Sequence, residues 1–473
     1  MTQSQPTRIE KDSMGEMNVP ADALYGASTQ RAVLNFPVSG QGFTRPYIRA
    51  LGLVKLACAE VNRELGLLPP ATAEPILAAC QEVIDGRLDS HFVVDIYQTG
   101  SGTSTNMNAN EVIANRAGEI AGAGRASKAF HPNDHVNMGQ SSNDVIPTAM
   151  HVAIAEQLAS VLIPALDRLA AALTEKERAW DNIVKIGRTH LMDATPIRLG
   201  QVFGGFAQQA ILSSARARKA ILALRELPQG GTAVGTGINT HIEFGKRVAA
   251  RLARLTGIDF IEAHNHFEAQ AAKDGVIEAS GLLKTIALAL AKIANDVRWL
   301  GSGPRCGIGE ILLPATQPGS SIMPGKVNPV MSESLLQACS FTIGADACAT
   351  HAVTWGSVFE LNVAMPVVAH QLLEAIRILA AATQNFAEKC IAGAEANVQR
   401  CEGLIEQSLA MCTSLAPIVG YDAAAAMAKQ SYLTGKTVRE IALASGKLPP
   451  EKVAEAMDVR AMTMPGASGA ASG

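Results

Sequence analysis

The stretch Phe267–Leu300 reads FEAQAAKDGVIEASGLLKTIALALAKIANDVRWL and stops at Gly301-Ser302-Gly303-Pro304. Its many Ala and Leu residues and the lack of internal Pro predict one continuous α-helix. At about 1.5 Å per residue this helix would be about 50 Å long, which is too long for a small single-layer domain. The stretch therefore predicts a long helical bundle, which we expect to be shared between subunits.

The sequence on both sides of this stretch has the same helical character. A leucine run from Leu158 to Leu173, spaced by three and four, places its side chains on one helical face, and Pro164 should kink that helix. Few charges interrupt the long stretches, and helices that are apolar on several sides are buried, here by oligomerisation. Four more helices are expected over Arg45–Leu65, Gln201–Glu226, Pro329–Val353 and Pro366–Cys390.

The chain is therefore expected to be all-α and to have three domains. These are an N-terminal domain over residues 1–140, a central long-helix bundle over 141–394 and a small C-terminal domain over 395–473. The last eight residues, from Gly466, are Gly, Ala and Ser only, and we expect them to be disordered.

Composition excludes several classes of function. Lys and Arg number 40 against 43 Asp and Glu, and aromatic residues make up 4%, so neither a basic face nor base-stacking platforms for nucleic acid are expected. The N-terminus lacks an apolar run, and no uninterrupted apolar stretch reaches about 18 residues, so we expect no signal peptide, no membrane span and a cytoplasmic location. The eight cysteines include no C-x-x-C pair, which favours buried free thiols.

Four segments break the apolar background with Gly, hydroxyl and amide residues, and each is expected to be a loop. Such loops are either plain turns or sites where backbone N–H groups point at an anion, and four of them favour a site built from several loops. The segments are Thr99–Asn110, Met138–Thr148, Ile186–Pro196 and Pro318–Glu333.

The fourth segment begins PGSSIMPGKVNP, over Pro318–Pro329. Its Pro and Gly residues fix a loop shape, while Lys326 supplies a positive charge and Asn328 a neutral donor for a carboxylate. Glu333 follows near the start of the next expected helix, where a carboxylate also stabilises the helix dipole.

The part from Gly319 to Pro329 resembles the signature loop of the fumarase/aspartase superfamily, and the resemblance extends over about Arg8–Met464. Four residue runs and one tripeptide carry it further: Thr99–Thr103, Asn106-Met107-Asn108, His131–Asp134, Gln140–Asp144 and Gly187–His190. His190 and Ser142 resemble the class II fumarases, whereas aspartate ammonia-lyases usually have Gln and Thr there.

This resemblance implies a three-domain, nearly all-α fold and a homotetramer whose active sites combine three subunits. It also implies reversible conversion of fumarate and water to (S)-malate in the tricarboxylic acid cycle, a small dicarboxylate substrate and no cofactor. The alternatives are an aspartate ammonia-lyase or another superfamily lyase, such as an argininosuccinate lyase-like enzyme, and a non-catalytic structural protein.

The resemblance also assigns roles to residues. Ser320 is the expected base, and Lys326 stabilises the charge of the intermediate. His190 would act through a water and pair with Glu333. Substrate-binding roles are implied for Ser101, Gly102, Thr103, Ser141, Ser142, Asn143, Thr189, Ser321, Lys326 and Asn328. A secondary dicarboxylate site, or a plain turn that starts a helix, is implied at His131, Pro132, Asn133 and Asp134.

No metal site is expected. The sequence has no cysteine grouping for a cluster and no compact His, Asp and Glu set for magnesium or zinc. The negative charge of the reaction intermediate would then have to be met by Lys326, Asn328 and backbone donors.

Overall fold

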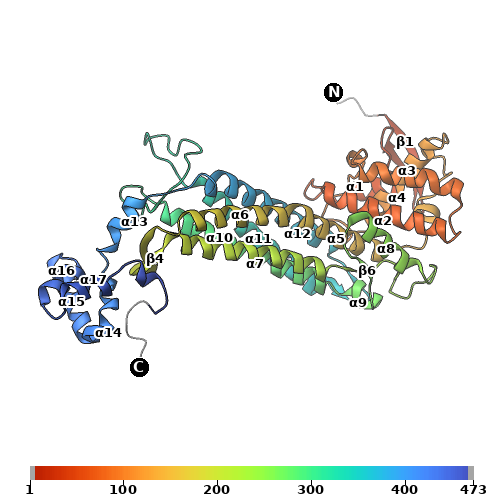
Figure 1. Ribbon diagram of the computed structural model, residues 1–473. Helices are drawn as coiled ribbons and strands as arrows, with labels where there is room; N and C mark the ends of the chain where they lie inside the picture. The colour runs from red at the N-terminus through yellow and green to blue at the C-terminus, as the bar shows by residue number, and fades with distance from the viewer. Residues whose placement is uncertain (1–5, 467–473) are drawn as a thin grey trace. The chain divides into compact units, whose positions relative to one another are not determined.

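The computed structural model describes residues 6–466 (Figure 1). The chain forms two compact units. The first contains the chain up to Pro164 together with Ser214–Ala287 and Ala338–Ala380, and the second contains Ala165–Ser213, Leu288–Gln337 and the chain from Ala381. The three-part division expected from sequence stays a prediction.

Helices dominate the described residues, which confirms the predicted fold class. The long helices are α6 (Ile163–Ala179), α7 (Leu199–Ala223), α10 (Asp274–Leu300), α11 (Val330–Gly356) and α12 (Met365–Phe386). A π-helical segment, Leu158–Leu162, precedes α6, so the regular α-helix is interrupted just before Pro164. A second π-helical segment, Ala387–Ile391, follows α12.

The prediction of one helix over Phe267–Leu300 was wrong. The stretch contains the short helix α9 (His266–Ala271), a break at Ala272 and Lys273, and then α10. Ala272 is extended, with φ −80° and ψ 163°, and the Lys273 ammonium donates to two carbonyl groups of α9 and to that of Ala272. A buried side-chain cap therefore ends α9 where the apolar pattern alone continues.

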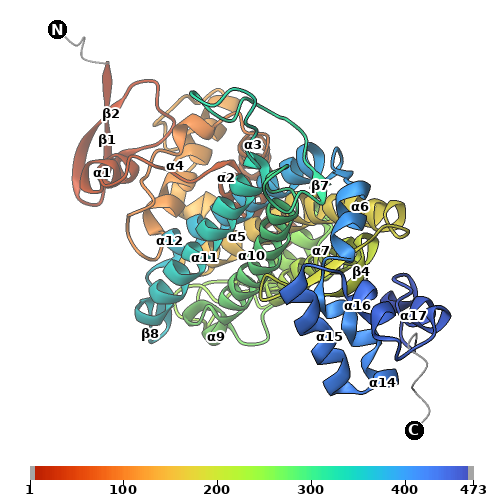
Figure 2. The same ribbon diagram turned by 90° about the vertical axis from the view of Figure 1, so that its left-hand side faces the viewer.

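The first unit begins with a hairpin of β1 (Thr7–Asp12) and β2 (Gly15–Pro20), which lies beside α1 (Ala27–Asn35) (Figure 2). Its other helices before α9 are α2 (Arg45–Glu64), α3 (Pro70–Ile84), α4 (Thr103–Ile120), α5 (Ser142–Gln157) and α8 (Phe244–Thr256). Its remaining strand pairs are β5 (Glu226–Leu227) with β6 (Ile261–Glu262) and β8 (Ser357–Val358) with β9 (Leu361–Asn362). Short turns of helix lie at Asp89–His91 and Pro132–Val136.

Two of the polar segments expected to be loops are largely helical. The hydroxyl-rich residues of Thr99–Asn110 and Met138–Thr148 occupy the first turns of α4 and α5. The third segment forms the hairpin of β3 (Val184–Thr189) and β4 (Met192–Arg198). For α5 the reason is that Ser141 and Asp144 cap the helix start, since Ser and Asp side chains cap helices as readily as they form turns. Helix α4 instead begins after Gly102, which has no side-chain cap.

The second unit contains this hairpin and a helical C-terminal part. Strand β7 (Ile311–Leu312) pairs with β10 (Glu395–Ala396). The C-terminal helices are α13 (Val398–Ile405), α14 (Ala416–Val419), α15 (Tyr421–Thr434), α16 (Val438–Ser445) and α17 (Pro450–Ala456), with 3₁₀ turns at Leu409–Ser414 and Ala461–Thr463. The tail predicted to be disordered lies outside the described residues from position 467 onward.

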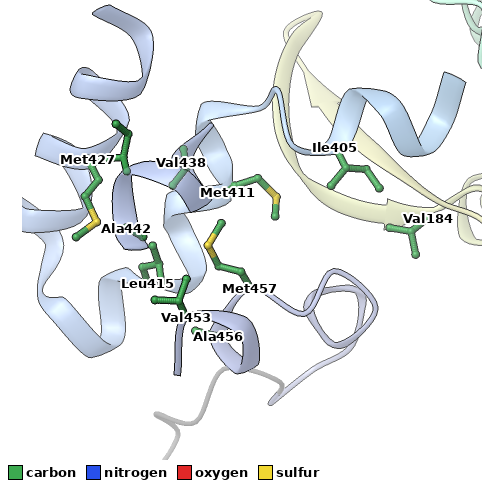
Figure 3. Close-up of a cluster of buried hydrophobic side chains, with 11 residues drawn as sticks. Val184, Ile405, Met411, Leu415, Met427, Val438, Ala442, Val453, Ala456 and Met457 are labelled. Carbon is green, nitrogen blue, oxygen red and sulfur yellow. The ribbon is translucent and has the colours of Figure 1, made fainter. Parts of the chain in front are cut away.

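A buried apolar cluster holds the C-terminal helices together (Figure 3). Met411, Leu415 and Met457 have no exposed surface, and they pack with Val438 and Val453. Each such side chain contributes about 1.5–3 kcal/mol when it is removed from water. Val184 of β3 belongs to the same cluster, so the hairpin is anchored to these helices.

Two helical stretches, Ser142–Ala179 and Met365–Ile391, are long and apolar enough to cross a membrane by length and composition. Most residues in the most apolar part of each stretch are buried inside the molecule, as in core helices of a soluble protein. All eight cysteines are free, and Cys306 and Cys348 are exposed rather than buried as expected.

Candidate active site

Three predicted carboxylate-binding residues meet where α4 and α5 begin. The Thr103 hydroxyl lies 2.8 Å from the Ser101 hydroxyl and 2.7 Å from the Ser142 hydroxyl. Thr103 is the first residue of α4 and Ser142 the first residue of α5. Two segments that are 39 residues apart in sequence therefore form one hydroxyl cluster.

Glycine is required next to this cluster. Gly102 has φ +72°, and a Cβ there would lie 2.8 Å from the Ile146 side chain. A Cβ on Gly100 would lie 1.7 Å from the Val363 carbonyl oxygen. The approach at Gly102 brings the Ser101–Thr103 segment close to α5, and the approach at Gly100 brings it close to Val363.

The start of α5 is a capping box. Ser141 Oγ accepts the Asn143 backbone N–H at 3.2 Å, and Asp144 Oδ1 accepts the Ser141 backbone N–H at 2.9 Å. The Asn143 side chain donates to the Ala233 carbonyl at 2.7 Å. Asp144 lies in the Gln140–Asp144 run, but no capping role was predicted for it, although Ser141-x-x-Asp144 resembles the Ser/Thr-x-x-Glu capping-box pattern.

The two helix starts give the hydroxyl cluster a positive potential. The first N–H groups of a helix have no partner within the helix, and they carry the positive end of its dipole. Thr103 and Ser142 are the first residues of α4 and α5, so the hydroxyl cluster lies at the positive end of both helices. An anion such as a carboxylate is the ligand that this arrangement favours.

Thr189 and His190 lie at the tip of the β3–β4 hairpin. Thr189 pairs with Met192, which leaves His190 and Leu191 as a two-residue turn. Their φ angles are +55° and +62°, as in a type I′ turn, which Asn and Gly normally occupy. His and Leu side chains in this region of φ are strained, and such strain is concentrated at functional sites.

A buried ion cluster supports the base of this hairpin. Arg188 Nη1 lies 2.9 Å from Glu310 Oε1, and Lys185 Nζ lies 3.0 Å from Glu310 Oε2. The Glu310 side chain is fully buried, so removing its carboxylate would leave the buried Lys185 ammonium without an ion-pair partner. Neither Lys185 nor Glu310 was predicted from the sequence, because no local pattern joins residues 125 positions apart.

The signature loop folds on itself around Ser320. Ser320 Oγ accepts the backbone N–H groups of Ile322 at 3.2 Å and Met323 at 3.0 Å. The Asn328 side chain donates to the Gly319 carbonyl at 2.7 Å, and the Gly319 N–H donates to the Lys326 carbonyl at 2.9 Å. Donors at Ser320 Oγ would favour its ionised form.

Most of the other predicted catalytic and substrate-binding residues of the second unit are exposed on the chain. His190, Thr189, Ser321 and Lys326 are exposed, and Glu333 is half-buried in the first turn of α11. Within residues 6–466 the side chains of His190, Lys326 and Glu333 have no hydrogen bond or ion pair. The structure thus brings together the hydroxyl cluster and, separately, the signature loop, but it gives no contact between His190 and Glu333.

The predicted secondary site forms a short π-helical turn, Pro132–Val136. His131 Nδ1 accepts the backbone N–H groups of Asn133 at 3.3 Å and Asp134 at 3.1 Å, so His131 caps the turn. A cavity of about 430 Å³ is lined by His131, Pro132 and Asn133 together with the β1–β2 hairpin and α4. The local geometry is therefore compatible with both predictions for this segment, a plain turn and a dicarboxylate-binding site.

No group of three or more His, Cys, Asp or Glu residues suited to hold a metal ion occurs in the described part of the chain.

Known protein families and relatives match this chain over nearly its full length. Residues 15–344 match the Lyase family, and residues 411–464 match the Fumarase C C-terminus family. The chain is 51% identical over 463 residues to fumarate hydratase class II of Mycobacterium tuberculosis, covering 96% of each chain. It is 52% identical over 460 residues to fumarate hydratase class II of Halobacterium salinarum, covering 97% of this chain and 98% of that protein.

A solved structure agrees with the sequence relatives. The crystal structure of a class II fumarase from Schistosoma mansoni superimposes with a TM-score of 0.95 at 37% identity, covering 98% of this chain and all of the other. The chain belongs to the class II fumarate hydratase family. The resemblance seen in the sequence is thereby confirmed.

In this member of the class II fumarate hydratase family, four further polar residues lie next to the site. Lys55 of α2 donates to Asn137 Oδ1 and Gln140 Oε1, both at 2.9 Å, and Asn106 of α4 also donates to Asn137 Oδ1. Asn137 and Gln140 lead directly into the capping box of α5. The sequence gives no sign of the contacts of Lys55 with Asn137 and Gln140, because Lys55 is a single lysine within a mostly apolar helix.

Proposed function

We propose that this chain catalyses the reversible hydration of fumarate to (S)-malate. The observation that carries the proposal is its full-length similarity to proteins named fumarate hydratase class II. The hydroxyl cluster at the starts of α4 and α5 supports it, since two helix N-termini favour a carboxylate.

The first chemical step from malate is removal of a proton from carbon 3. That carbon is a weak acid because the neighbouring carboxylate is already negative, and the intermediate is an aci-carboxylate with extra negative charge. We assign the proton to Ser320 Oγ, whose two backbone donors support the alkoxide form. Lys326 and Asn328 would stabilise the added charge.

The second step breaks the bond between carbon 2 and the hydroxyl group. The electron pair left on carbon 3 forms the double bond, and the hydroxide leaves as water after it receives a proton. We assign this proton to His190, acting through a water, with Glu333 as the group that orients its ring. The substrate carboxylates would be held by Ser101, Thr103, Ser141, Ser142, Asn143 and Thr189. The neighbouring substrate-binding residues would be Gly102, Ser321, Lys326 and Asn328.

We also propose a homotetramer whose active sites combine residues of different subunits. The outward-facing positions of His190, Thr189 and Lys326 support this proposal, because each presents its side chain away from the chain that carries it. The His131–Asp134 turn would then be a separate dicarboxylate site on each chain.

One assay tests the reaction. The purified protein is incubated with (S)-malate and, separately, with aspartate, while the ultraviolet absorbance of the conjugated double bond is followed. We expect signal from malate and almost none from aspartate, because His190 and Ser142 stand where aspartate ammonia-lyases usually have Gln and Thr. Faster turnover of aspartate than of malate would overturn the assignment in favour of an ammonia-lyase.

A further inference from the structure

Lys55 places a charged group deep inside the first unit. It lies in the middle of α2 and is 0% exposed. Its ammonium donates to two neutral amide oxygens, Asn137 Oδ1 and Gln140 Oε1. Within residues 6–466 it forms no ion pair, so its charge is not cancelled by direct contact with a carboxylate.

The two acceptors belong to the segment that leads into the carboxylate-binding residues. Asn137 Nδ2 donates to the Gln140 carbonyl at 3.1 Å, and Asn106 of α4 donates to Asn137 Oδ1 at 3.1 Å. Gln140 is followed at once by Ser141, the N-cap of α5. Lys55 is therefore bonded to the turn that leads into α5, and Asn106 in the first turn of α4 donates to the same turn.

The titratable groups that face Lys55 come from three helices. Among residues 6–466, Asp144 of α5 is the one carboxylate of this set, and it already accepts backbone N–H groups of Ser141, Gly230 and Thr232. Cys58 of α2 and Cys80 of α3 are the others, and burial raises the pKa of the Cys80 thiol to about 12 and that of Cys58 further. Both thiols are therefore neutral near pH 7.

We propose that Lys55 is a positioning residue of the carboxylate-binding site, which fixes the Asn137–Gln140 turn and adds a buried positive charge behind the starts of α4 and α5. The proposal rests on the proposed function, because it assumes that this cluster binds a dicarboxylate. A buried charge is weakly screened, so it acts on a dianion more strongly than on a monoanion.

The proposal predicts a specific pH dependence. Burial lowers the pKa of Lys55 to about 8, so the ammonium is present at pH 7 and mostly lost at pH 9. A dicarboxylate should then bind more weakly at the higher pH in the wild-type protein. A variant without the ammonium should lack this change.

The test measures binding of succinate, a dicarboxylate without a double bond, by calorimetry at pH 7 and pH 9. We expect Lys55→Met to raise the Kd at pH 7 by about 10–100-fold, the range for a lost hydrogen-bonded charge. The wild-type Kd should rise between pH 7 and pH 9, and that of Lys55→Met should not. Lys452→Met, which removes an exposed lysine of α17, is the matched control and should behave as wild type.

A second variant tests the proposal even if the Lys55→Met protein does not fold. Asn137→Asp retains the oxygen that Lys55 binds but cancels its charge, so it should also raise the Kd and weaken the pH dependence. Unchanged Kd values in either folded variant, or a wild-type pH dependence that persists without the ammonium, would overturn the proposal. Succinate binding needs no turnover, so a protein that binds succinate through Lys55 but does not hydrate fumarate would refute the proposed function alone.

Discussion

At the scale of single residues, the chemistry depends on how a serine is made basic. An isolated hydroxyl is a very weak base, and only its alkoxide accepts a carbon-bound proton at a useful rate. The turn Ser320–Met323 supplies two backbone donors to Ser320 Oγ, at 3.2 and 3.0 Å. These donors stabilise the oxyanion without a side-chain partner, so loss of the hydroxyl should remove the proton acceptor but leave the loop folded.

We therefore expect Ser320→Ala to lower kcat by at least about 10²–10⁴-fold, the range for lost general acid–base catalysis. Binding of succinate should change little, because Lys326, Asn328 and Thr189 remain. His190→Asn should lower kcat less if water partly replaces the imidazole. The measurement is hydrogen exchange at carbon 3 of malate in heavy water.

The two variants separate the roles of base and acid. Exchange should be lost in Ser320→Ala and retained in His190→Asn. The reverse result, with wild-type exchange in Ser320→Ala and none in His190→Asn, would show that Ser320 is not the base.

The sequence predicts some of these residues and not others. Ser320, Lys326 and Asn328 stand in one short loop, so a local pattern finds them. Lys55 and Asn137 are 82 residues apart, and only the tertiary structure joins them. Buried charges such as Lys55 also occur singly within apolar helices, where composition predicts core residues.

At the scale of elements, the junction between α9 and α10 shows where periodicity fails. The apolar spacing continues through the junction, yet Lys273 ends α9 by donating to the carbonyl groups of Ala269, Gln270 and Ala272 at 3.0, 2.8 and 2.6 Å. Lys273 is 2% exposed. The long helices themselves were predictable because their apolar faces extend over many turns, whereas this cap depends on one side chain.

The junction predicts a pH effect on stability. Burial lowers the pKa of Lys273 to about 7, whereas in the unfolded chain it is near 10.5. Between these values the unfolded state binds a proton that the folded state does not, so this residue makes the free energy of unfolding rise with pH. From pH 7.5 to 9.5 the rise should be about 2 kcal/mol larger in wild type than in Lys273→Met.

The measurement is urea unfolding at one fixed protein concentration, since assembly would shift the apparent stability. Lys429→Met, which removes an exposed lysine of α15, should keep the wild-type rise. An equal rise in Lys273→Met would mean that the ammonium of Lys273 stays charged in the folded protein.

At the scale of the whole molecule, α11 has a face that a lone chain would leave in water. The helix carries only two charged residues, Glu333 and Asp346, and Asp346 is turned inward to Ser280 and Lys284. The exposed face at spacings of three and four contains no charge and consists of Phe341, Gly344, Cys348, His351 and Trp355. An uncharged, largely apolar face of this length is typical of a subunit interface.

Gly344 offers a clean test of this interface. A Cβ there would meet nothing within 4 Å inside the chain, and Arg is a better helix former than Gly, so Gly344→Arg should fold normally. In a tetramer built on this face the new charge would be buried, and we expect light scattering to show smaller species. If active sites are shared, activity should fall at least about 100-fold, as for misplaced catalytic groups.

The matched control is Ala425→Arg, which adds the same side chain at an exposed position of α15 and should change neither mass nor activity. Three results for Gly344→Arg have distinct meanings. Smaller species without activity support both the interface and the shared site, because the hydroxyl cluster and the signature loop of each chain remain intact. Smaller species with full activity would show that one chain completes its own site. An unchanged tetramer would remove this face of α11 from the interface.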